Sequence, residues 1–229
     1  MEQRVVILGG PAEGSIIAEA LTQARAAGAP LCIGGFLNDR VERGDTIYGF
    51  PVFGRLDDWR ELDEDVRFAW ALQKVGAMPQ RVERLENLGI PDHRWISVRH
   101  PQSFVASSVE VGIGSFIASF VTVQPMARIG RFASLRGGAN LGHHCQLGDH
   151  AYVGPNASLL GYARMETGAC LGGNAVLMAR KTLGAFAIAG IGSAVTKDVP
   201  AGAVVFGSPA RQIRVIPQSA EQQPVSAEA

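Results

Sequence analysis

Apolar residues recur every six positions through the second half of the chain. Counting by six from Val105 to Val195 lands on an apolar residue at all sixteen positions. Glycine follows directly in half of these repeats, and the fourth residue after each position is small in nearly all, with Lys181 as the clear exception. This pattern is typical of a triangular parallel β-solenoid, whose faces are short strands and whose corners are tight turns. We predict a left-handed parallel β-helix of about five coils, with about 18 residues per coil and coils spaced roughly 4.8 Å apart.

The first half of the chain has a different rhythm. The apolar runs VVIL, LCIGGFL and VRFAWAL predict buried strands, while SIIAEALTQARAAG and PQRVERLENLG have helical spacing. Their alternation predicts a small α/β domain with a Rossmann-like parallel sheet. We therefore expect an α/β domain at 1–97, the left-handed β-helix at 98–206, and an exit segment with a disordered tail at 207–229. The tail VIPQSAEQQPVSAEA has little to bury.

Composition narrows the classes of partner. Lys and Arg (21) balance Asp and Glu (21), so no overall field favours nucleic acid or an anionic membrane. The three cysteines are too few and too scattered for a disulfide framework, which suggests a reducing cytoplasm. No run approaches the roughly 20 apolar residues of a membrane span, and no signal peptide is visible.

The candidate chemistry lies in LGHHCQLGDH, residues 141–150, which contains three of the five histidines. His143 falls two places after an apolar repeat position, and is therefore expected on a turn. Gly161 comes one coil later and should stack on the same corner. An imidazole suits base catalysis near neutral pH, and a bare amide N–H beside it could hold a carbonyl oxygen.

Over almost its whole length the chain resembles the sugar acetyltransferases of the sialic acid O-acetyltransferase and bacillosamine or perosamine N-acetyltransferase type. The resemblance rests on VVILGGPAEGS, GFLND, RHPQSFV, the hexads, GHHCQLGDHAYVGPNASLLG and GSAVTKDVPAGAVVFGSPARQI. It implies a homotrimer that transfers acetyl from acetyl-CoA directly to the amino group, or less often the hydroxyl, of a nucleotide-linked sugar. His143 would be the general base, and the Gly161 amide would face the thioester carbonyl. The pantetheine arm would run along the solenoid between adjacent subunits.

The same resemblance implies roles for further residues. Binding of acetyl-CoA would involve Gly173 besides Gly161, with Lys197 and Arg211 as candidates for contact with the CoA phosphates. In the α/β domain, the loop between the first strand and helix would offer backbone N–H groups to a diphosphate, and a carboxylate after the second strand would reach the base or ribose. The resemblance thus implies that Gly9, Gly10, Glu13, Gly14 and Asp39 would contact the acceptor.

Four positions depart from the family pattern. His144 stands where an Asp or Glu usually orients the base, so it is a candidate for a catalytic or substrate-contacting role, with a solvated turn residue as the alternative. Arg136 replaces an asparagine, Tyr152 replaces a histidine, and Glu13 replaces a frequent histidine. A carboxylate at position 13 would repel a diphosphate if it pointed inward. These departures leave the acceptor and its nucleotide carrier open.

Other readings remain beside these. The glycine loop fits neither standard phosphate-binding motif and could be a simple turn before a helix. Cys145, Asp149 and His150 are expected to fill the core, shape a turn and pack, respectively. A zinc-dependent lyase or hydratase of the same fold is disfavoured by the histidine spacing, and no metal is expected. A non-catalytic binding or scaffold protein would keep the solenoid without the chemistry.

Overall fold

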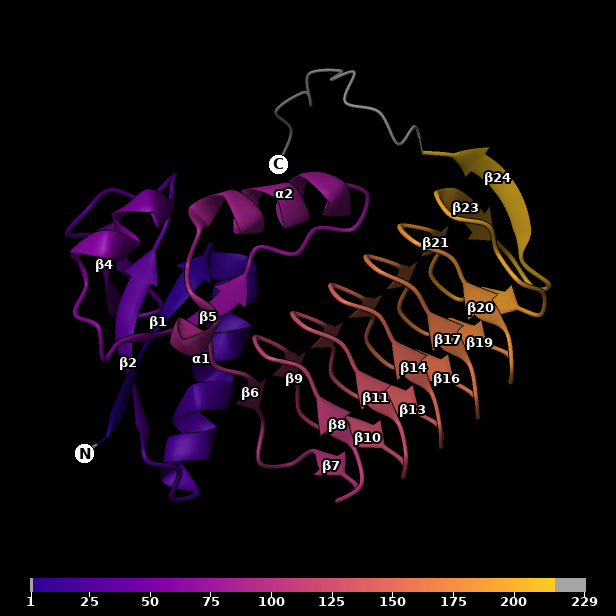
Figure 1. Ribbon diagram of the computed structural model, residues 1–229, viewed down its shortest axis with the longest axis horizontal. Coiled ribbons are helices and arrows are strands. Elements are labelled where there is room, and N and C mark those ends of the chain that lie inside the picture. Colours follow the sequence, from indigo (N-terminus) through magenta and orange to yellow (C-terminus); the bar gives the residue numbers. More distant parts are fainter. Residues whose placement is uncertain (1, 217–229) are drawn as a thin grey trace.

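The computed structural model describes residues 2–216, with an α/β domain on one side and a row of coils leading away from it (Figure 1). The α/β domain has a five-stranded sheet in the order β3-β4-β2-β1-β5. Its strands are β1 (Gln3–Gly9), β2 (Leu31–Leu37), β3 (Thr46–Ile47), β4 (Phe50–Gly54) and β5 (Arg67–Ala71). All pairs are parallel except β3 with β4, so the apolar runs form the parallel sheet that their alternation with helices predicted.

Two α-helices and two short 3-10 helices complete this domain. The helix α1 (Pro11–Ala26) begins four residues before the helical pattern at Ser15 suggested, because proline is well tolerated in a first turn. The helix α2 (Met78–Leu88) ends at Gly89, whose φ of 63° is left-handed and favours glycine. The 3-10 helices η1 (Leu56–Glu61) and η2 (Asp92–Arg94) and the β3–β4 hairpin had no clear signal in the apolar pattern.

The second half is a parallel β-helix, as predicted. Each of the sixteen repeat positions is the second residue of a two-residue strand, and residues 18 apart pair in register. Sheet I contains β6 (Val98–Arg99), β9 (Phe116–Ile117), β12 (Ser134–Leu135), β15 (Tyr152–Val153), β18 (Cys170–Leu171), β21 (Ile188–Ala189), β23 (Ala203–Phe206) and β24 (Arg211–Val215).

Sheets II and III form the other two faces of the solenoid. Sheet II contains β7 (Phe104–Val105), β10 (Thr122–Val123), β13 (Asn140–Leu141), β16 (Ser158–Leu159), β19 (Val176–Leu177) and β22 (Ala194–Val195). Sheet III contains β8 (Glu110–Val111), β11 (Arg128–Ile129), β14 (Gln146–Leu147), β17 (Arg164–Met165) and β20 (Thr182–Leu183). The chain visits the sheets in the order I, II, III, so each coil has three corners, between I and II, II and III, and III and I.

The interior of the coils explains the small residues of the repeat. From Ile117 onward the repeat residue of each hexad points inward, as Leu135 and Leu141 do, and the small residue four positions later, such as Ala139, fills the space left at the corner. All three are fully buried. A larger side chain at the alanine position would overfill a core that is already close-packed.

The α/β domain packs on sheet I. The helix α1 contacts β6, and Phe132, before β12, joins the aromatic cluster of Phe68 and Trp95. Further along sheet I, Met78 of α2 packs with Cys170 and other apolar residues. Sheet I is therefore covered by the α/β domain, whereas the corner between sheets II and III lies on the opposite side of the coils.

The last coil is closed by the C-terminal segment. β24 pairs antiparallel with β23, and the N–H of Ala210 donates to the carbonyl of Ala194 in β22, 2.8 Å away. The expected disorder therefore starts too early at Val215: this residue lies in β24, and the N–H of Ile216 donates to Gly202. Backbone pairing with β23 orders it without burial of side chains. The rest of the predicted disordered tail, 217–229, lies outside the described residues.

Candidate functional site

His143 lies at the corner between sheets II and III, exposed to solvent. Its carbonyl accepts a hydrogen bond from the N–H of Tyr162, one coil further along, at 3.0 Å. The ring reaches over Gly161: a Cβ atom built on that glycine would lie only 2.8 Å from Nε2 of His143. The stacking expected from the 18-residue spacing thus brings an imidazole nitrogen directly against the glycine backbone.

The backbone N–H of Gly161 is a donor without an acceptor. None of the hydrogen bonds formed among residues 2–216 uses it. At the corresponding turn position of the corner between sheets III and I, the N–H of Arg131 donates to the Asp149 carboxylate at 2.7 Å. An unpaired N–H beside an imidazole is suited to binding an oxyanion.

His144 contacts His143. Its backbone has a φ of 59°, and its Nδ1 lies 3.1 Å from Nδ1 of His143. Its ring stacks on Tyr162 with centroids 4.7 Å apart and an interplanar angle of 19°. The guanidinium of Arg180 lies over the other residue of this stack, 4.5 Å from the centroid of Tyr162. The second histidine is therefore held in place rather than free on a turn.

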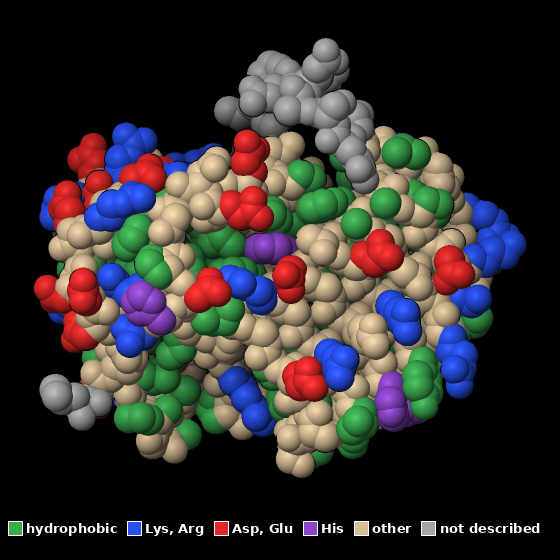
Figure 2. Space-filling view, in the orientation of Figure 1, with side chains coloured by type: hydrophobic (Ala, Val, Ile, Leu, Met, Phe, Trp, Pro, Cys, Tyr) green, Lys and Arg blue, Asp and Glu red, His purple; other side chains and the backbone are tan. Residues whose placement is uncertain are grey.

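A groove of about 370 Å³ lies beside His144 on sheet III. Its lining includes Glu110, Arg128 and Arg164, and Arg128 pairs with Glu110 at 3.4 Å. On the face of the molecule seen in Figure 2, acidic and basic side chains are scattered over the coils. Charge of both signs therefore surrounds the edge of the site.

The remaining residues expected to bind acetyl-CoA lie at different corners. Lys197 belongs to the same column as His143 and Gly161, three coils above His143, or roughly 14 Å away. Gly173 follows β18 and lies at the corner between sheets I and II instead. Arg211 starts β24 on sheet I, next to the loop that closes β22. One chain therefore brings Gly161 and Lys197 into line but keeps Gly173 on another edge.

The glycine loop is only partly available to a ligand. Gly14 lies inside α1, its N–H donates to the carbonyl of Gly10 at 2.9 Å, and a Cβ there would lie 2.7 Å from Phe36. The expectation that Gly14 presents its N–H to a diphosphate is thus corrected, because helix bonding and packing explain this glycine. At Gly9 a Cβ would meet the carbonyl oxygen of Ala71 at 2.5 Å, which reflects close strand packing.

The first turn of α1 still has amides that no helix carbonyl can reach, at Ala12 and Glu13. Gly10 caps this helix at the end of β1. The loop is held by Asn38, a buried residue whose role no sequence motif indicated. Its side-chain amide donates to the carbonyl of Gly9 at 2.8 Å, and its oxygen accepts from the N–H of Arg40.

Asp39 is already engaged within the domain. One carboxylate oxygen accepts the N–H of Leu56 at 3.0 Å, and the other lies 3.5 Å from Arg84. Arg55 is 3.9 Å away. The carboxylate therefore joins the end of β2 to η1 and α2, and a ligand at this position would have to share it.

Glu13 does not carry an isolated charge. It forms an ion pair with Arg136, which follows β12 in sheet I. The Arg136 side chain is only 7% exposed and lies between the rings of Phe116 and Tyr152, at 5.5 and 6.0 Å. The expected repulsion of a diphosphate is thereby corrected, because Arg136 neutralises the carboxylate. Two positions that depart separately from the family pattern form one pair in space.

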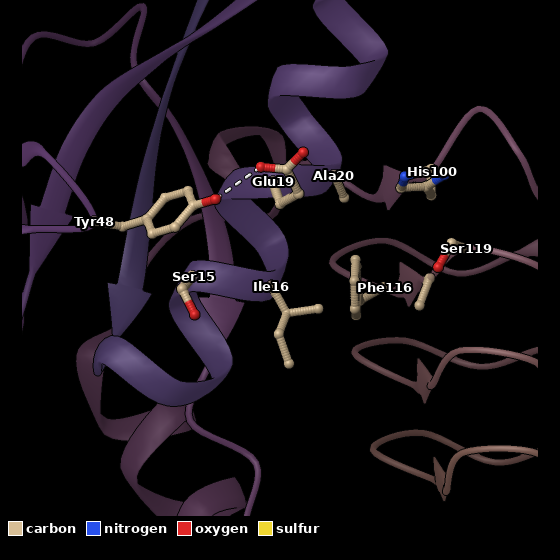
Figure 3. Close-up of a pocket in the computed structure, with 9 residues that line it drawn as sticks. Ser15, Ile16, Glu19, Ala20, Tyr48, His100, Phe116 and Ser119 are labelled. Carbon is tan, nitrogen blue, oxygen red and sulfur yellow. Dashed lines mark hydrogen bonds between the residues drawn. The ribbon is translucent and has the colours of Figure 1, made fainter.

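A cavity of about 300 Å³ opens between α1 and the first coils (Figure 3). Ile16 of α1 and Phe116 of β9 line it, together with His100 and Ser119. At its rim the Tyr48 hydroxyl donates to the Glu19 carboxylate at 2.8 Å, and the bonds from Gln23 and Tyr48 lower the pKa of Glu19. No local sequence motif predicts this cavity, because it forms where the two halves of the chain pack together.

Three residues have the structural roles expected of them. His150 is buried and stacks on Phe132 with centroids 5.4 Å apart, and burial lowers its pKa. Asp149 accepts the backbone bond from Arg131 described above. Cys145 is fully buried, and burial raises the pKa of its thiol to about 11.

Residues 2–216 contain neither a cluster of metal-binding side chains nor a helix that could span a membrane. In this range the structure brings no three His, Cys, Asp or Glu side chains close enough to hold a metal ion. Neither helix is both long and apolar enough to span a membrane.

Several solved structures resemble this chain. No family model matches the chain, and no curated protein matches it. Among solved structures, the acetyltransferase domain of PglB from Neisseria gonorrhoeae, in complex with acetyl coenzyme A, is 26% identical. Its TM-score is 0.81, and the match covers 93% of this chain and 100% of that one. A mutant of perosamine N-acetyltransferase from Caulobacter crescentus, in complex with CoA and GDP-perosamine, is 28% identical with a TM-score of 0.78, covering 92% and 96%.

The resemblance to the sugar N-acetyltransferases is confirmed. WeeI from Acinetobacter baumannii is a further match, 26% identical with a TM-score of 0.77, over 91% of this chain and 99% of that one. These alignments extend over both the α/β domain and the β-helix. The likeness to the sugar N-acetyltransferases of the hexapeptide-repeat class is therefore one of overall architecture and not of the coils alone.

Proposed function

We propose that the protein transfers acetyl from acetyl-CoA to the amino group of a nucleotide-linked sugar. The observation that carries the proposal is the exposed corner at which Nε2 of His143 meets a glycine with an unpaired N–H. The ligands of the similar structures support it, since one holds acetyl coenzyme A and another holds CoA and GDP-perosamine. A sugar hydroxyl is the competing acceptor.

The chemistry follows from the two groups at this corner. His143 takes a proton at Nε2 from the amine as it attacks the thioester carbonyl, and the Gly161 N–H stabilises the oxyanion of the tetrahedral intermediate. Collapse of that intermediate breaks the C–S bond, and the proton returns to the departing thiolate. General base catalysis contributes about 10²- to 10⁴-fold, and one oxyanion donor roughly 3 kcal/mol.

Transfer is direct in this proposal, without an acyl-enzyme. The nearest thiol, Cys145, is buried, and the pKa of about 11 that burial gives it leaves almost no thiolate at neutral pH. Its side chain points into the coil and contacts the carbonyl of Leu160 at 3.2 Å. It is therefore unsuited to act as the nucleophile.

The column above His143 offers a track for the cofactor. Gly161, Ala179 and Lys197 succeed one another along the corner between sheets II and III. A pantetheine arm lying along this column would place its thioester at Gly161 and its phosphates toward Lys197. Arg211 lies at the same end of the coils and is a second candidate for the phosphates.

The outer face of sheet II favours a second copy of the chain as partner. In the described coils its outward strand positions include no Asp, Glu, Lys or Arg, and Phe104 is 59% exposed. Leu160, Val176 and Met178 are exposed on the same face. An uncharged face of this kind is typical of a protein interface. We propose that three copies close around it as a homotrimer.

Threefold closure would complete the site. Around an axis facing sheet II, the edge next to sheet III of one copy meets the edge next to sheet I of the next. His143 and Arg136 lie in the same coil on these two opposite edges. The base of one copy would then face the Glu13–Arg136 pair, the cavity at Phe116 and Gly173 of its neighbour. Within one chain these groups are separated by the width of sheet II.

In this assembly each segment of the chain has its own function. We assign 1–97 to a Rossmann-like domain that binds the nucleotide-linked sugar, through Gly10 and the first turn of α1. The β-helix at 98–206 would hold acetyl-CoA and the base, and the exit segment would begin at 207.

The experiment that tests the function is thiol release from acetyl-CoA with a panel of UDP-, GDP- and CMP-linked amino sugars. Mass spectrometry of the product, followed by mild alkali that cleaves esters but not amides, separates O- from N-acetylation. Release with one sugar and an alkali-stable product is expected. Binding of acetyl-CoA without turnover by any sugar would favour the scaffold protein, and zinc-dependent activity on another substrate would favour the lyase or hydratase.

A further inference from the structure

The two adjacent histidines share a single hydrogen bond. Nδ1 of His143 and Nδ1 of His144 are 3.1 Å apart, and the two rings are nearly perpendicular, at 89°. A neutral imidazole has one nitrogen that donates and one that accepts. Such a contact is attractive only when one Nδ1 carries the hydrogen and the other does not.

The position of the other nitrogen decides which histidine donates. Nε2 of His143 is the atom that faces Gly161, so a base at this corner needs its free lone pair there. The hydrogen of neutral His143 must then be on Nδ1, and His144 must accept it. His144 accepts at Nδ1 only as the neutral ring with its hydrogen on Nε2.

We propose that His144 is a positioning residue that holds His143 in the Nδ1–H tautomer and does so only while His144 is itself neutral. This inference rests on the proposed function, because it assigns His143 the role of base. A carboxylate after the base would remain an acceptor throughout the neutral range. Protonated His144 instead presents an N–H to the N–H of His143, and the bond is lost.

The surroundings keep the His144 ring in the accepting position. It stacks on Tyr162, and the guanidinium of Arg180 covers Tyr162 in turn. The residue one coil earlier at this corner, Met126, is apolar and lines the same groove. Rotation of the His144 ring away from His143 would break its stacking on Tyr162.

The charged groups around His144 are mostly cationic. Glu110, Arg128 and Arg164 line the groove beside it, and Glu110 is paired with Arg128. Arg164 and Arg180 add positive charge, and His143 becomes cationic during the reaction. No carboxylate among the described groups bonds His144, so protonation of this ring brings one more positive charge into the site without a partner of its own.

The consequence is an acid limb governed by two protons instead of one. Transfer requires both His143 and His144 to be neutral. On the acid side, a plot of log(kcat/KM) against pH therefore rises with one unit of slope for each histidine. Titration of the acceptor amine adds the same slope to the pH profile of wild type and of each variant. It therefore cancels when these profiles are compared. His144→Asn keeps an acceptor oxygen but cannot titrate, and asparagine tolerates the left-handed backbone.

The kinetic test compares wild type, His144→Asn and His144→Leu with one acceptor. His144→Asn is expected to stay within about threefold of wild type at the plateau and to have an acid limb less steep by one unit. His144→Leu is expected to lose about 10-fold to 100-fold in kcat at the plateau, as for other groups that orient a functional histidine, and the difference from wild type should shrink on the acid side. Equal slopes in wild type and His144→Asn would overturn the proposal.

A second readout does not depend on turnover. In protein with ¹⁵N-labelled histidine, ring-nitrogen shifts report which nitrogen of each ring carries hydrogen, and single substitutions assign the five histidines. Wild type is expected to show His143 protonated on Nδ1 above neutral pH, and His144→Leu a mixture of tautomers. Hydrogen on Nε2 of His143 in wild type would overturn the proposal. If no sugar is acetylated but this tautomer pattern is found, the pairing holds and the proposed function fails instead.

Discussion

The carboxylate of Glu13 pairs with the guanidinium of Arg136 and so ties the first turn of α1 to the coil that carries His143. The pair spans the junction of the two halves of the chain, and its arginine is buried between Phe116 and Tyr152. It keeps the glycine loop and the start of α1 at a set height along the β-helix.

Breaking this pair from one side should destabilise the junction. Glu13→Gln leaves a buried guanidinium without its carboxylate, and about 2 kcal/mol of stability is expected to be lost, less than for a fully buried pair because Glu13 is 30% exposed. The measurement is a double-mutant cycle with Arg136→Gln in denaturant unfolding. Arg25→Gln, which breaks the exposed pair with Glu2, is the control and should cost less than about 1 kcal/mol. Equal effects of the two pairs would contradict a special role for the junction.

Gly161→Ala should abolish transfer without disturbing the fold. The added methyl group would lie 2.8 Å from Nε2 of His143, so the imidazole must move away from Gly161. At least about 100-fold loss of kcat is expected, the scale of a misplaced general base, because alanine keeps the backbone N–H. Ala179 occupies the next position of the same column, which shows that alanine suits this turn. Unchanged kcat in Gly161→Ala, measured by thiol release, would exclude this glycine from the site.

Lys197 should act on the phosphates of the donor and not on its thioester. Lys197→Ala is expected to raise KM for acetyl-CoA about fivefold with kcat unchanged, since one exposed ionic contact contributes about 1 kcal/mol. Acetyl-pantetheine, which lacks the nucleotide phosphates, is the matched substrate and should show no difference between the variant and wild type. A fall in kcat with both donors would place Lys197 elsewhere.

Stability should decrease with acidity because of His150. Burial lowers the pKa of this histidine in the folded protein, so the unfolded chain binds the proton more readily. The stabilising contribution is therefore fully present above the ordinary histidine pKa of about 6.5 and is lost as pH falls from there through the lowered folded value. His150→Asn, which suits the left-handed φ of 59°, should flatten this part of the profile. Parallel unfolding profiles for both proteins would refute the assignment.

The sequence was most informative where the structure repeats. The sixteen apolar positions predicted the sixteen strands from β7 to β22 and the stacking of Gly161 on His143, because a solenoid converts sequence distance directly into height. The start of α1 and the roles of Gly14 and Asp39 were less predictable. They depend on how α1 meets β2 and how η1 and α2 meet the end of β2, and such long-range packing leaves no periodic signal.

The sequence contains an indication that Glu13 pairs with Arg136, but the pattern of apolar positions does not reveal it. At two positions 123 residues apart, the family pattern has neutral or weakly basic side chains, whereas this chain has side chains of opposite charge. Only the structure shows that these positions meet. The cavity at Phe116 had no such signal, because its walls come from α1, the β3–β4 hairpin and the first coils.

The measurement that tests the account most directly is thiol release by His143→Ala beside wild type, with acetyl-CoA binding and sedimentation recorded for both. The side chain of His143 lies on an exposed turn and supports no core, so turnover should fall at least about 100-fold while binding and assembly are unchanged. Full turnover by the variant would contradict the assignment of the base. Loss of activity together with unfolding or dissociation would show that His143 is a structural residue.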